Sequence, residues 1–280
     1  MATSLSGKKV LITGASSGIG AAIAQTLAEQ GCLVWGTTRD LAKVATFPEP
    51  LRQKVKFLAM DVNDDHSVRT GVDRFMAEAG GIDILINNAG FGVFGPLEEF
   101  PLAKVKEIFE TNYFGALRLI QAVAPVMREQ GAGLIINITS LAARFVIPFQ
   151  VHYSATKSAL SALTEGLRQE LRPFGVKVVA VEPGDIKTNF NNVTQFGLKE
   201  ASPYKKWTEP SWRVIDVNME KSPSPQVVAD QVLKIAGQKN PRPYYVAGDF
   251  LSTKFPFIAR FVSQRFKEKL TRIFYGIDFK

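Results

Sequence analysis

A tyrosine and a lysine stand four residues apart, at Tyr153 and Lys157, in a segment whose pattern predicts a helix over residues 153–171. Side chains at this spacing lie on one face of a helix, so the hydroxyl and the ammonium are expected to be neighbours. A tyrosine hydroxyl has an ordinary pKa of about 10, which is too high for easy proton exchange near neutral pH. A nearby positive charge stabilises the tyrosinate and lowers that pKa, which would let Tyr153 act as a general acid and base.

Ser140 is a third residue that suits such chemistry. It follows a strand predicted over residues 134–138, and its hydroxyl could hold a substrate oxygen beside Tyr153. The spacing Y-x-x-x-K is nevertheless common by chance, and a surface tyrosine and lysine on an amphipathic helix would look the same. These three residues therefore indicate a catalytic site only in combination with the elements around them.

A glycine-rich segment near the N-terminus predicts a phosphate-binding turn. Residues 13–20 read T-G-A-S-S-G-I-G, between a strand predicted over 10–13 and a helix predicted over 20–30. Glycines allow a tight turn and a close approach of a pyrophosphate, and a helix N-terminus favours negative charge. The G-x-x-x-G-x-G spacing differs from the commoner G-x-G-x-x-G, but its place at the first strand-to-helix junction predicts a dinucleotide site. The residues expected to form it are Gly14, Ser16, Ser17, Gly18, Ile19 and Gly20.

The end of the second predicted strand, over 33–36, bears on which dinucleotide is bound. An acidic residue there binds the ribose 2′-hydroxyl of NAD, whereas a basic residue accommodates the 2′-phosphate of NADP. Thr38 stands where the acid is expected and Arg39 follows it, and a guanidinium can pair bidentately with a phosphate. NADP(H) is therefore favoured over NAD(H). The alternative is that Arg39 is a solvated loop cation and that Asp40 binds the ribose.

Polar and small residues also follow the third and fourth predicted strands, over 57–61 and 84–87. A carboxylate at the first of these ends could meet an adenine edge, and the N-N-A-G of residues 87–90 suits close packing around a nucleotide. Either group alone could be an ordinary turn. The residues expected to contact the cofactor here are Asp61, Val62, Asn88, Ala89 and Gly90.

Strands and helices alternate over the first two thirds of the chain, which predicts an α/β fold with a doubly wound parallel sheet, a Rossmann fold, in a single domain over 1–250. Ligands of such folds bind beyond the carboxyl ends of the strands. Residues 186–224 show no clear period and are expected to form a substrate loop or lid. The remaining predicted elements are helices over 67–78, 102–129 and 225–236 and strands over 176–181 and 244–247.

The order of these features resembles that of the short-chain dehydrogenase/reductase family, and within it the hydroxysteroid- and retinol-dehydrogenase-like members. The resemblance covers about residues 7–190 and implies an enzyme that interconverts a carbonyl and an alcohol, for which Thr38 and Arg39 favour NADP(H) as the cofactor. The glycine spacing and the Tyr–Lys gap set aside the sugar-nucleotide-modifying and enoyl-reducing branches. The resemblance rests on Thr13–Gly20, Asn87–Gly90, Asn112, Ser140, Tyr153, Lys157, Pro183 and Gly184.

The resemblance also assigns a catalytic tetrad to Asn112, Ser140, Tyr153 and Lys157. It implies that the tyrosine is the general acid and base and that the serine orients the substrate. The lysine would bind the nicotinamide ribose and tune the tyrosine, and the asparagine would support a proton relay through water.

Further cofactor contacts follow from the same resemblance. They are assigned to Pro183 and Gly184, and to Ile186 and Thr188 at the nicotinamide carboxamide. The family usually forms dimers or tetramers, so a homodimer or homotetramer is expected. No metal site is expected.

Apolar residues dominate the segments expected to line the substrate site. Such a lining favours a bulky hydrophobic carbonyl, such as a steroid, a retinoid or a fatty-acyl-derived ketone. The alternative is that many of the aromatic residues pack in the core or at a subunit interface. His152 is expected to be structural or pocket-lining, because a helix turns it off the face of Tyr153. The apolar candidates are Phe91, Val93, Phe94, Leu141, Phe145, Val146, Phe149, Phe190, Phe196, Tyr204, Trp207 and Trp212.

The net charge of +8 is concentrated at the C-terminal end, because residues 251–280 hold seven Lys and Arg against two Asp and Glu. Nucleic-acid binding by the whole domain is therefore not indicated. Apolar residues from Ile258 to Ile273 recur at helical spacing among basic residues, which predicts a basic amphipathic extension over 251–280. Such a helix could lie on an anionic membrane, cover the substrate cleft or pack on a partner subunit, and packing on protein is favoured.

The single cysteine, Cys32, and the lack of a recognisable secretory leader predict a reducing, cytoplasmic setting, with peripheral membrane contact through the tail as a variant. No apolar run approaches the roughly 20 residues needed to span a bilayer. The competing function is a non-catalytic NADPH-binding regulator or scaffold of the same fold, which would bind the cofactor without turnover.

Overall fold

Seven parallel strands form the main sheet of the computed structural model, which describes residues 4–249, 253 and 261–277. They are β1 (Lys9–Ile12), β2 (Leu33–Thr38), β3 (Val55–Ala59), β4 (Ile84–Asn87), β6 (Gly133–Ile138), β7 (Val176–Pro183) and β9 (Tyr244–Ala247). Their order in the sheet is β3-β2-β1-β4-β6-β7-β9, so the winding reverses between β1 and β4. The predicted α/β fold with a doubly wound parallel sheet is confirmed.

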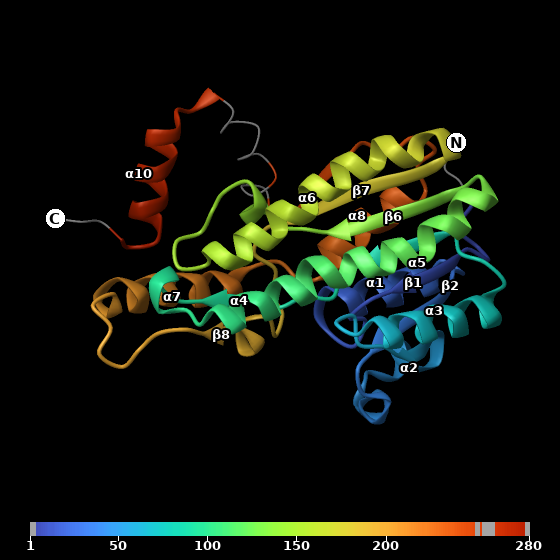
Figure 1. Ribbon diagram of the computed structural model, residues 1–280, viewed down its shortest axis with the longest axis horizontal. Helices are drawn as coiled ribbons and strands as arrows, with labels where there is room; N and C mark the ends of the chain where they lie inside the picture. Colours follow the sequence, from blue (N-terminus) through green and yellow to red (C-terminus); the bar gives the residue numbers. More distant parts are fainter. Residues whose placement is uncertain (1–3, 250–252, 254–260, 278–280) are drawn as a thin grey trace.

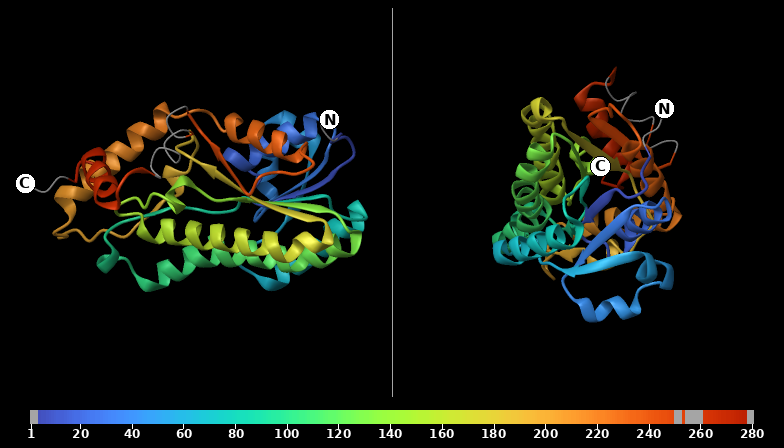
Figure 2. Two further views of the ribbon diagram at one scale, coloured as in Figure 1. Left: turned by 90° about the horizontal axis from the view of Figure 1, so that it is seen from above. Right: turned by 90° about the vertical axis from the view of Figure 1, so that its right-hand side faces the viewer.

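Helices cover both faces of this sheet (Figures 1 and 2). They are α1 (Gly18–Glu29), α2 (Glu49–Lys54), α3 (Asp65–Ala79), α4 (Leu102–Phe109), α5 (Gly115–Gln130), α6 (Val151–Leu171), α7 (Lys205–Lys221), α8 (Gln226–Ala236) and α10 (Gln264–Phe274). One face packs Val10 and Ile12 of β1 against α1 and α8, and the other packs Leu11 against α3, α5 and α6. Strands buried on both faces read as unbroken apolar runs, which is why the sequence located them.

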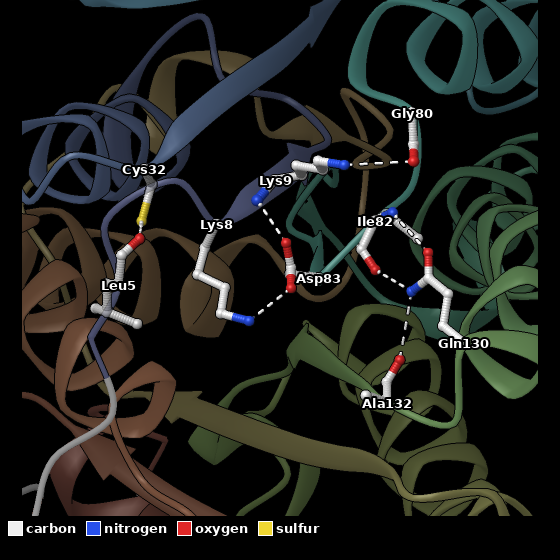
Figure 3. A network of polar contacts seen from close by, with 9 residues as sticks. All are labelled: Leu5, Lys8, Lys9, Cys32, Gly80, Ile82, Asp83, Gln130 and Ala132. Carbon is white, nitrogen blue, oxygen red and sulfur yellow. Dashed lines mark hydrogen bonds and ion pairs between the residues drawn. The ribbon is translucent and has the colours of Figure 1, made fainter.

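A polar network joins β1 and β4 at their amino ends (Figure 3). Asp83 accepts a hydrogen bond from the Lys8 ammonium at 2.7 Å and another from the Lys9 backbone N–H at 2.9 Å. Gln130 holds Ile82 from two sides: its Nε2 donates to the Ile82 carbonyl at 2.7 Å, and its Oε1 accepts from the Ile82 N–H at 3.2 Å. These bonds anchor the sheet at the end opposite to the one where its ligands are expected.

The helix predicted over 102–129 is divided in the structure. A π-helical turn, Glu110–Phe114, separates α4 from α5. Such turns fit one extra residue into a helix and are frequent at functional sites. Asn112 lies in this turn and is buried.

The segment 186–224 contains more regular structure than predicted. A short strand β8 (Gln195–Phe196) pairs in parallel with β5 (Val93–Phe94), and α7 follows. The expectation of a loop without regular structure is therefore wrong over 205–221. The fully buried residues of α7 are the polar Thr208 and Ser211, and Pro210 lies inside the helix, so its sequence argues against a helix at three positions.

The helix α10 lies at the carboxyl end of the sheet, on the side of α7 (Figure 1). A Cβ atom on Gly276, just after α10, would lie 3.5 Å from the side chain of Pro210 in α7. Ile258 and Arg260, which the sequence places in the amphipathic stripe, lie outside the described residues, and the division of the chain at 250 stays a prediction. Among the helices in the described ranges, none is long and apolar enough to cross a membrane.

Candidate active site

One cavity of about 1130 Å³ opens at the carboxyl ends of the strands and brings most of the predicted site residues together. Its wall runs from the glycine-rich turn, past the ends of β2 and β3, to α6 and the segment after β7. The predicted residues that line it are Gly14, Ser16, Ser17, Gly18, Ile19, Thr38, Arg39, Asp61, Val62, Asn88, Ala89, Gly90, Ser140, Leu141, Phe145, Tyr153, Lys157, Pro183, Gly184, Ile186, Thr188 and Phe190.

The glycine-rich turn needs glycine at the positions where the backbone is left-handed or crowded. Gly14 and Gly18 have φ values of +64° and +55°. A Cβ atom on Gly20 would lie 2.3 Å from the Gly14 carbonyl oxygen, so Gly20 permits the turn to close and is not itself among the residues that line the cavity. Asn88 braces the turn, because its Nδ2 donates to the carbonyls of Thr13 and Gly14 at 3.0 Å each.

The N-terminus of α1 faces the cavity and can hold an anion. Its N-cap, Ser17, has extended backbone and makes no capping hydrogen bond through its side chain within the described part of the chain, and no acidic residue occupies the first turn. Unsatisfied N–H groups and the helix dipole favour a phosphate at such a place. The turn and the helix therefore fit the pyrophosphate of a dinucleotide.

Arg39 and Asp40, just past the end of β2, have different roles. The Asp40 carboxylate caps a 3₁₀ turn, Leu41–Thr46, by accepting from the Ala42 N–H at 3.0 Å. Arg39 is exposed, lines the cavity and has no ion-pair partner among the described residues. Asp40 thus has a structural task, whereas the Arg39 guanidinium is available to a ligand.

Lys157 is buried and binds the end of β6. Its ammonium donates to the Ile138 carbonyl at 2.9 Å and lies 5.8 Å from the centre of the Tyr153 ring. Ser140, two residues past β6, accepts from the Ala142 N–H at 3.1 Å and begins a 3₁₀ turn that follows the strand. The strand end and one turn of α6 thereby bring Ser140, Tyr153 and Lys157 to one wall of the cavity.

Burial shifts the pKa of both Tyr153 and Lys157 in α6. It raises the pKa of Tyr153 to about 12, a shift that the Ser140 hydroxyl opposes and the Asp185 carboxylate increases. It lowers the pKa of Lys157 to about 8. The expected lowering of the Tyr153 pKa is therefore not produced by the protein's own charges, because a low dielectric penalises the tyrosinate and the ammonium alike.

Asn112 lies behind the cavity wall and is not among the residues that line it. Its Oδ1 accepts from the Phe91 N–H and its Nδ2 donates to the Phe91 carbonyl, each at 3.0 Å. The same Nδ2 donates to the Thr156 hydroxyl at 3.2 Å. Asn112 thus ties the segment after β4 to α6, one residue before Lys157.

The apolar end of the cavity contains only part of the predicted set. Phe91, Leu141, Phe145, Val146 and Phe190 line the cavity, and the Phe190 ring lies 5.5 Å from that of Tyr153. Phe94 and Phe149, which the sequence predicts at the substrate site, are not among the residues that line the cavity. Their rings lie 5.9 Å apart in a separate aromatic cluster, in which Phe94 also packs 5.0 Å from Trp212 and Phe149 lies 6.4 Å from Tyr204.

His152 has the structural role that the sequence indicates. Its ring packs 5.4 Å from that of Phe100, and its Nε2 is buried with no hydrogen-bond partner in the described part of the chain. Burial lowers its pKa, which favours the neutral imidazole.

Among the cavity residues that the sequence did not single out, two groups bear on the site. Asp185 lies between predicted cofactor residues, and nothing in its sequence context signals its exposure to the cavity. The other group belongs to α10 and the residue after it. This part of the tail therefore covers the cleft, which was one of the alternatives that the sequence left open. These residues are Leu270, Thr271, Ile273, Phe274 and Tyr275.

Comparison with known families agrees with this geometry. The family described as short chain dehydrogenase matches residues 8–196. The chain belongs to the short-chain dehydrogenase family. It is therefore an oxidoreductase, and the matched range contains every residue of the predicted tetrad.

Individual relatives of this short-chain dehydrogenase span nearly all of it. A 3-ketodihydrosphingosine reductase of Bacteroides thetaiotaomicron is 35% identical over 271 residues, which are 96% of this chain and 98% of the relative. Retinol dehydrogenase 8 of Bos taurus is 34% identical over 251 residues, which are 84% of this chain and 79% of the relative. The crystal structure of a short-chain dehydrogenase from Streptomyces avermitilis, 30% identical, superposes with a TM-score of 0.78 over 96% of this chain and 99% of that chain.

We predict that Lys157 makes the stability of the folded protein rise as the pH increases from about 8 to 10.5. The folded protein releases this proton near pH 8, whereas the unfolded chain holds it to the ordinary value of 10.5, so the unfolded state binds more protons in that window. The free energy of unfolding in urea, measured for the wild type and for Lys157→Met at several pH values, tests this. Between pH 8 and pH 10.5, the free energy of unfolding of the wild type should rise relative to that of the variant by on the order of 1–3 kcal/mol. A difference that stays constant or moves the other way contradicts the burial of a titrating ammonium.

Proposed function

We propose that this short-chain dehydrogenase is an NADP(H)-dependent oxidoreductase that interconverts a carbonyl and an alcohol on a bulky hydrophobic molecule. The observation that carries the proposal is a single cavity with an anion-binding turn at one end, Tyr153 beside Ser140 and Lys157, and an apolar wall at the other end. A cofactor and a second molecule can share such a space with their reacting atoms close to the Tyr153 hydroxyl.

When bound, the nicotinamide supplies or accepts the hydride. In reduction, the Tyr153 hydroxyl donates its proton to the carbonyl oxygen, and the Ser140 hydroxyl donates a hydrogen bond that holds the same oxygen in place. The Lys157 ammonium, one helical turn away, stabilises the tyrosinate that remains. The raised pKa keeps Tyr153 protonated at neutral pH, which is the form that proton donation requires. Asn112 acts as a positioning residue, through Phe91 and Thr156.

The preference for NADP(H) rests on Arg39. Its guanidinium faces the cavity at the end of β2, and the neighbouring carboxylate of Asp40 is already used in capping. A 2′-phosphate at this place would pair with Arg39.

The substrate class rests on the apolar wall and on the relatives. Leu141, Phe145 and Phe190 on one side and Ile273 and Phe274 of α10 on the other suit an extended apolar molecule such as a lipid-derived ketone, a retinoid or a steroid. The relatives named above, a 3-ketodihydrosphingosine reductase and a retinol dehydrogenase, point to the same class.

We further propose that α10 contacts an anionic lipid surface. Its apolar stripe starts on the cavity wall and continues to exposed Phe266, and Phe261 before the helix is 81% exposed. Arg265 and Lys269 are exposed on the same helix, so apolar and cationic groups face solvent together. Association into a homodimer or homotetramer stays a prediction.

Replacing Tyr153 by phenylalanine tests the assignment of the proton donor. The variant keeps the ring and loses only the hydroxyl, so kcat/KM for NADPH oxidation with long-chain ketones should fall by about 10²- to 10⁴-fold while NADPH still binds. Tyr244→Phe, in β9 and outside the cavity, is the matched control and should keep its activity. Equal rates for Tyr153→Phe and the wild type would refute the role of Tyr153. If all three proteins bind NADPH and none of them, the wild type included, reduces a ketone, the non-catalytic NADPH-binding regulator is favoured.

The Arg39→Ala variant tests the cofactor preference. We expect the dissociation constant for NADPH to rise by about 10- to 100-fold, because a charge-assisted hydrogen-bonded pair is lost, and that for NADH to change little. Arg69→Ala, which removes an exposed arginine of α3, is the matched control. Parallel losses for the two cofactors would show that Arg39 does not bind a 2′-phosphate.

Vesicle co-sedimentation tests the lipid contact of α10. The wild type should bind vesicles that contain phosphatidylserine and bind pure phosphatidylcholine vesicles less, because cations and apolar side chains act together. The charge reversal Arg265→Glu with Lys269→Glu should abolish the binding, whereas Arg69→Glu should not. Binding that is absent in the wild type, or that survives the double reversal, argues against the contact.

A further inference from the structure

An ion pair between Arg144 and Glu182 anchors the turn that carries Ser140. The Arg144 Nε donates to the Glu182 Oε1 at 2.6 Å. Arg144 ends the 3₁₀ turn, Leu141–Ala143, that Ser140 begins. Glu182 lies in β7, directly before Pro183, which lines the active-site cavity. The pair therefore joins the serine turn to the end of β7, where the wall of that cavity continues.

The turn borders two cavities. Ser140 and Leu141 line the active-site cavity. Ala143 and Arg144 instead line a second cavity of about 350 Å³, together with Glu182. On that side the turn is not enclosed by close-packed side chains, so its position depends on specific bonds.

The helix α6 holds the turn less firmly than the ion pair does. The Ser158 hydroxyl, one residue past Lys157, lies 2.9 Å from the Ala143 carbonyl and 2.8 Å from the Ser154 carbonyl. A hydroxyl has one proton to donate, so this contact is divided between the turn and the helix itself. The bond between Arg144 and Glu182 is charge-assisted on both sides and is the stronger link.

The ion pair is a costly way to fasten a turn. The Glu182 side chain is fully buried, and its Oε2 has no hydrogen-bond partner within the described part of the chain. Burial raises the pKa of Glu182, a shift that Arg144 opposes. Apolar side chains of similar volume often stabilise a fold at least as well as a buried ion pair. What a guanidinium on a carboxylate adds is a fixed direction and distance.

The Ser140 hydroxyl is the group whose place this anchor determines. Burial raises the pKa of Tyr153, and the hydrogen bond between the Ser140 and Tyr153 side chains opposes that rise. The two hydroxyls therefore meet at the point where a carbonyl oxygen would be bound. A shift of the turn toward the second cavity would separate them, and a misplacement of about 1 Å can cost about 100-fold in rate.

We propose that Arg144 and Glu182 are positioning residues, whose ion pair holds the Ser140 hydroxyl at the place from which it binds the carbonyl oxygen beside Tyr153. The inference rests on the proposed function and adds to it two residues that do not touch the substrate. Their loss should lower kcat more than it weakens the binding of either the ketone or NADPH.

Variants that separate stability from activity test this role. Arg144→Met leaves Glu182 buried without its partner, so the thermal unfolding temperature should fall, and kcat for a long-chain ketone should fall by about 10- to 100-fold with little change in KM. In the double variant Arg144→Met with Glu182→Met no charge is left unpaired, so the unfolding temperature should recover while kcat stays low. Recovery of kcat together with the unfolding temperature, or an unchanged kcat in the double variant, would show that the pair is only structural and overturn the proposal.

A conservative variant adds a second criterion. Glu182→Gln keeps the shape of the side chain and an oxygen that can accept from Arg144, so its kcat should stay close to the wild-type value, whereas Glu182→Met should lose activity. Equal kcat values for these two variants would contradict positioning through this hydrogen bond. Arg74→Met, which breaks an ion pair with Glu78 in α3 at 3.0 Å, is the matched control and should keep its activity.

Hydrogen–deuterium exchange separates the failure of this inference from the failure of the proposed function. The backbone amides of residues 142–145 donate within the turn, so they should exchange faster in Arg144→Met and in the double variant than in the wild type or in Glu182→Gln. If exchange changes in this way but no protein, the wild type included, reduces a ketone, the anchor stands and the proposed reaction fails. If ketones are reduced but exchange in the turn is the same in every variant, the reaction stands and the anchor is wrong.

Discussion

The hydrogen bond from the buried Lys157 ammonium to the Ile138 carbonyl is the constraint on which the site depends. It fastens the first turns of α6 to the carboxyl end of β6, and this places Tyr153 on the same wall as Ser140. The ammonium loses most of its water when it is buried, which is why its pKa falls to about 8. Burial of the Lys157 ammonium costs stability, and a costly buried charge of this kind is typical of a functional site.

The remaining structure supports that bond from both ends of the sheet. At the amino ends, Asp83 and Gln130 fix the start of β4 beside β1. At the carboxyl ends, Asn88 braces the glycine-rich turn, and Asn112 ties the segment after β4 to α6. The side-chain amides of Asn88 and Asn112 bond mainly to backbone groups, so they hold the wall of the cavity in place.

The sequence predicted the sheet and much of the site because both depend on local signals. The strands over 84–87 and 244–247 were located to the residue, since buried strands are short apolar runs between turn residues. Tyr153, Lys157 and the glycine turn were found because each lies at a strand end or on one helix face. By contrast α7 was missed, because its fully buried positions are polar and it contains Pro210. The position of Phe149 outside the cavity lining could not be predicted, because its left-handed backbone (φ 63°) has no signature in a non-glycine residue. Asp185 was not predicted, because nothing in its sequence context indicates that it lines the cavity.

The most direct test of the account follows the hydride. NADPH carrying deuterium at the transferable position of C4 should deliver it to the carbinol carbon of the alcohol formed from a long-chain ketone, and mass spectrometry of the product detects it. We expect one deuterium per product molecule at that carbon, with a slower rate than for unlabelled NADPH when chemistry limits turnover. An alcohol product without deuterium, or cofactor oxidation without any alcohol, would contradict a cavity built to bring a nicotinamide and a carbonyl to Tyr153.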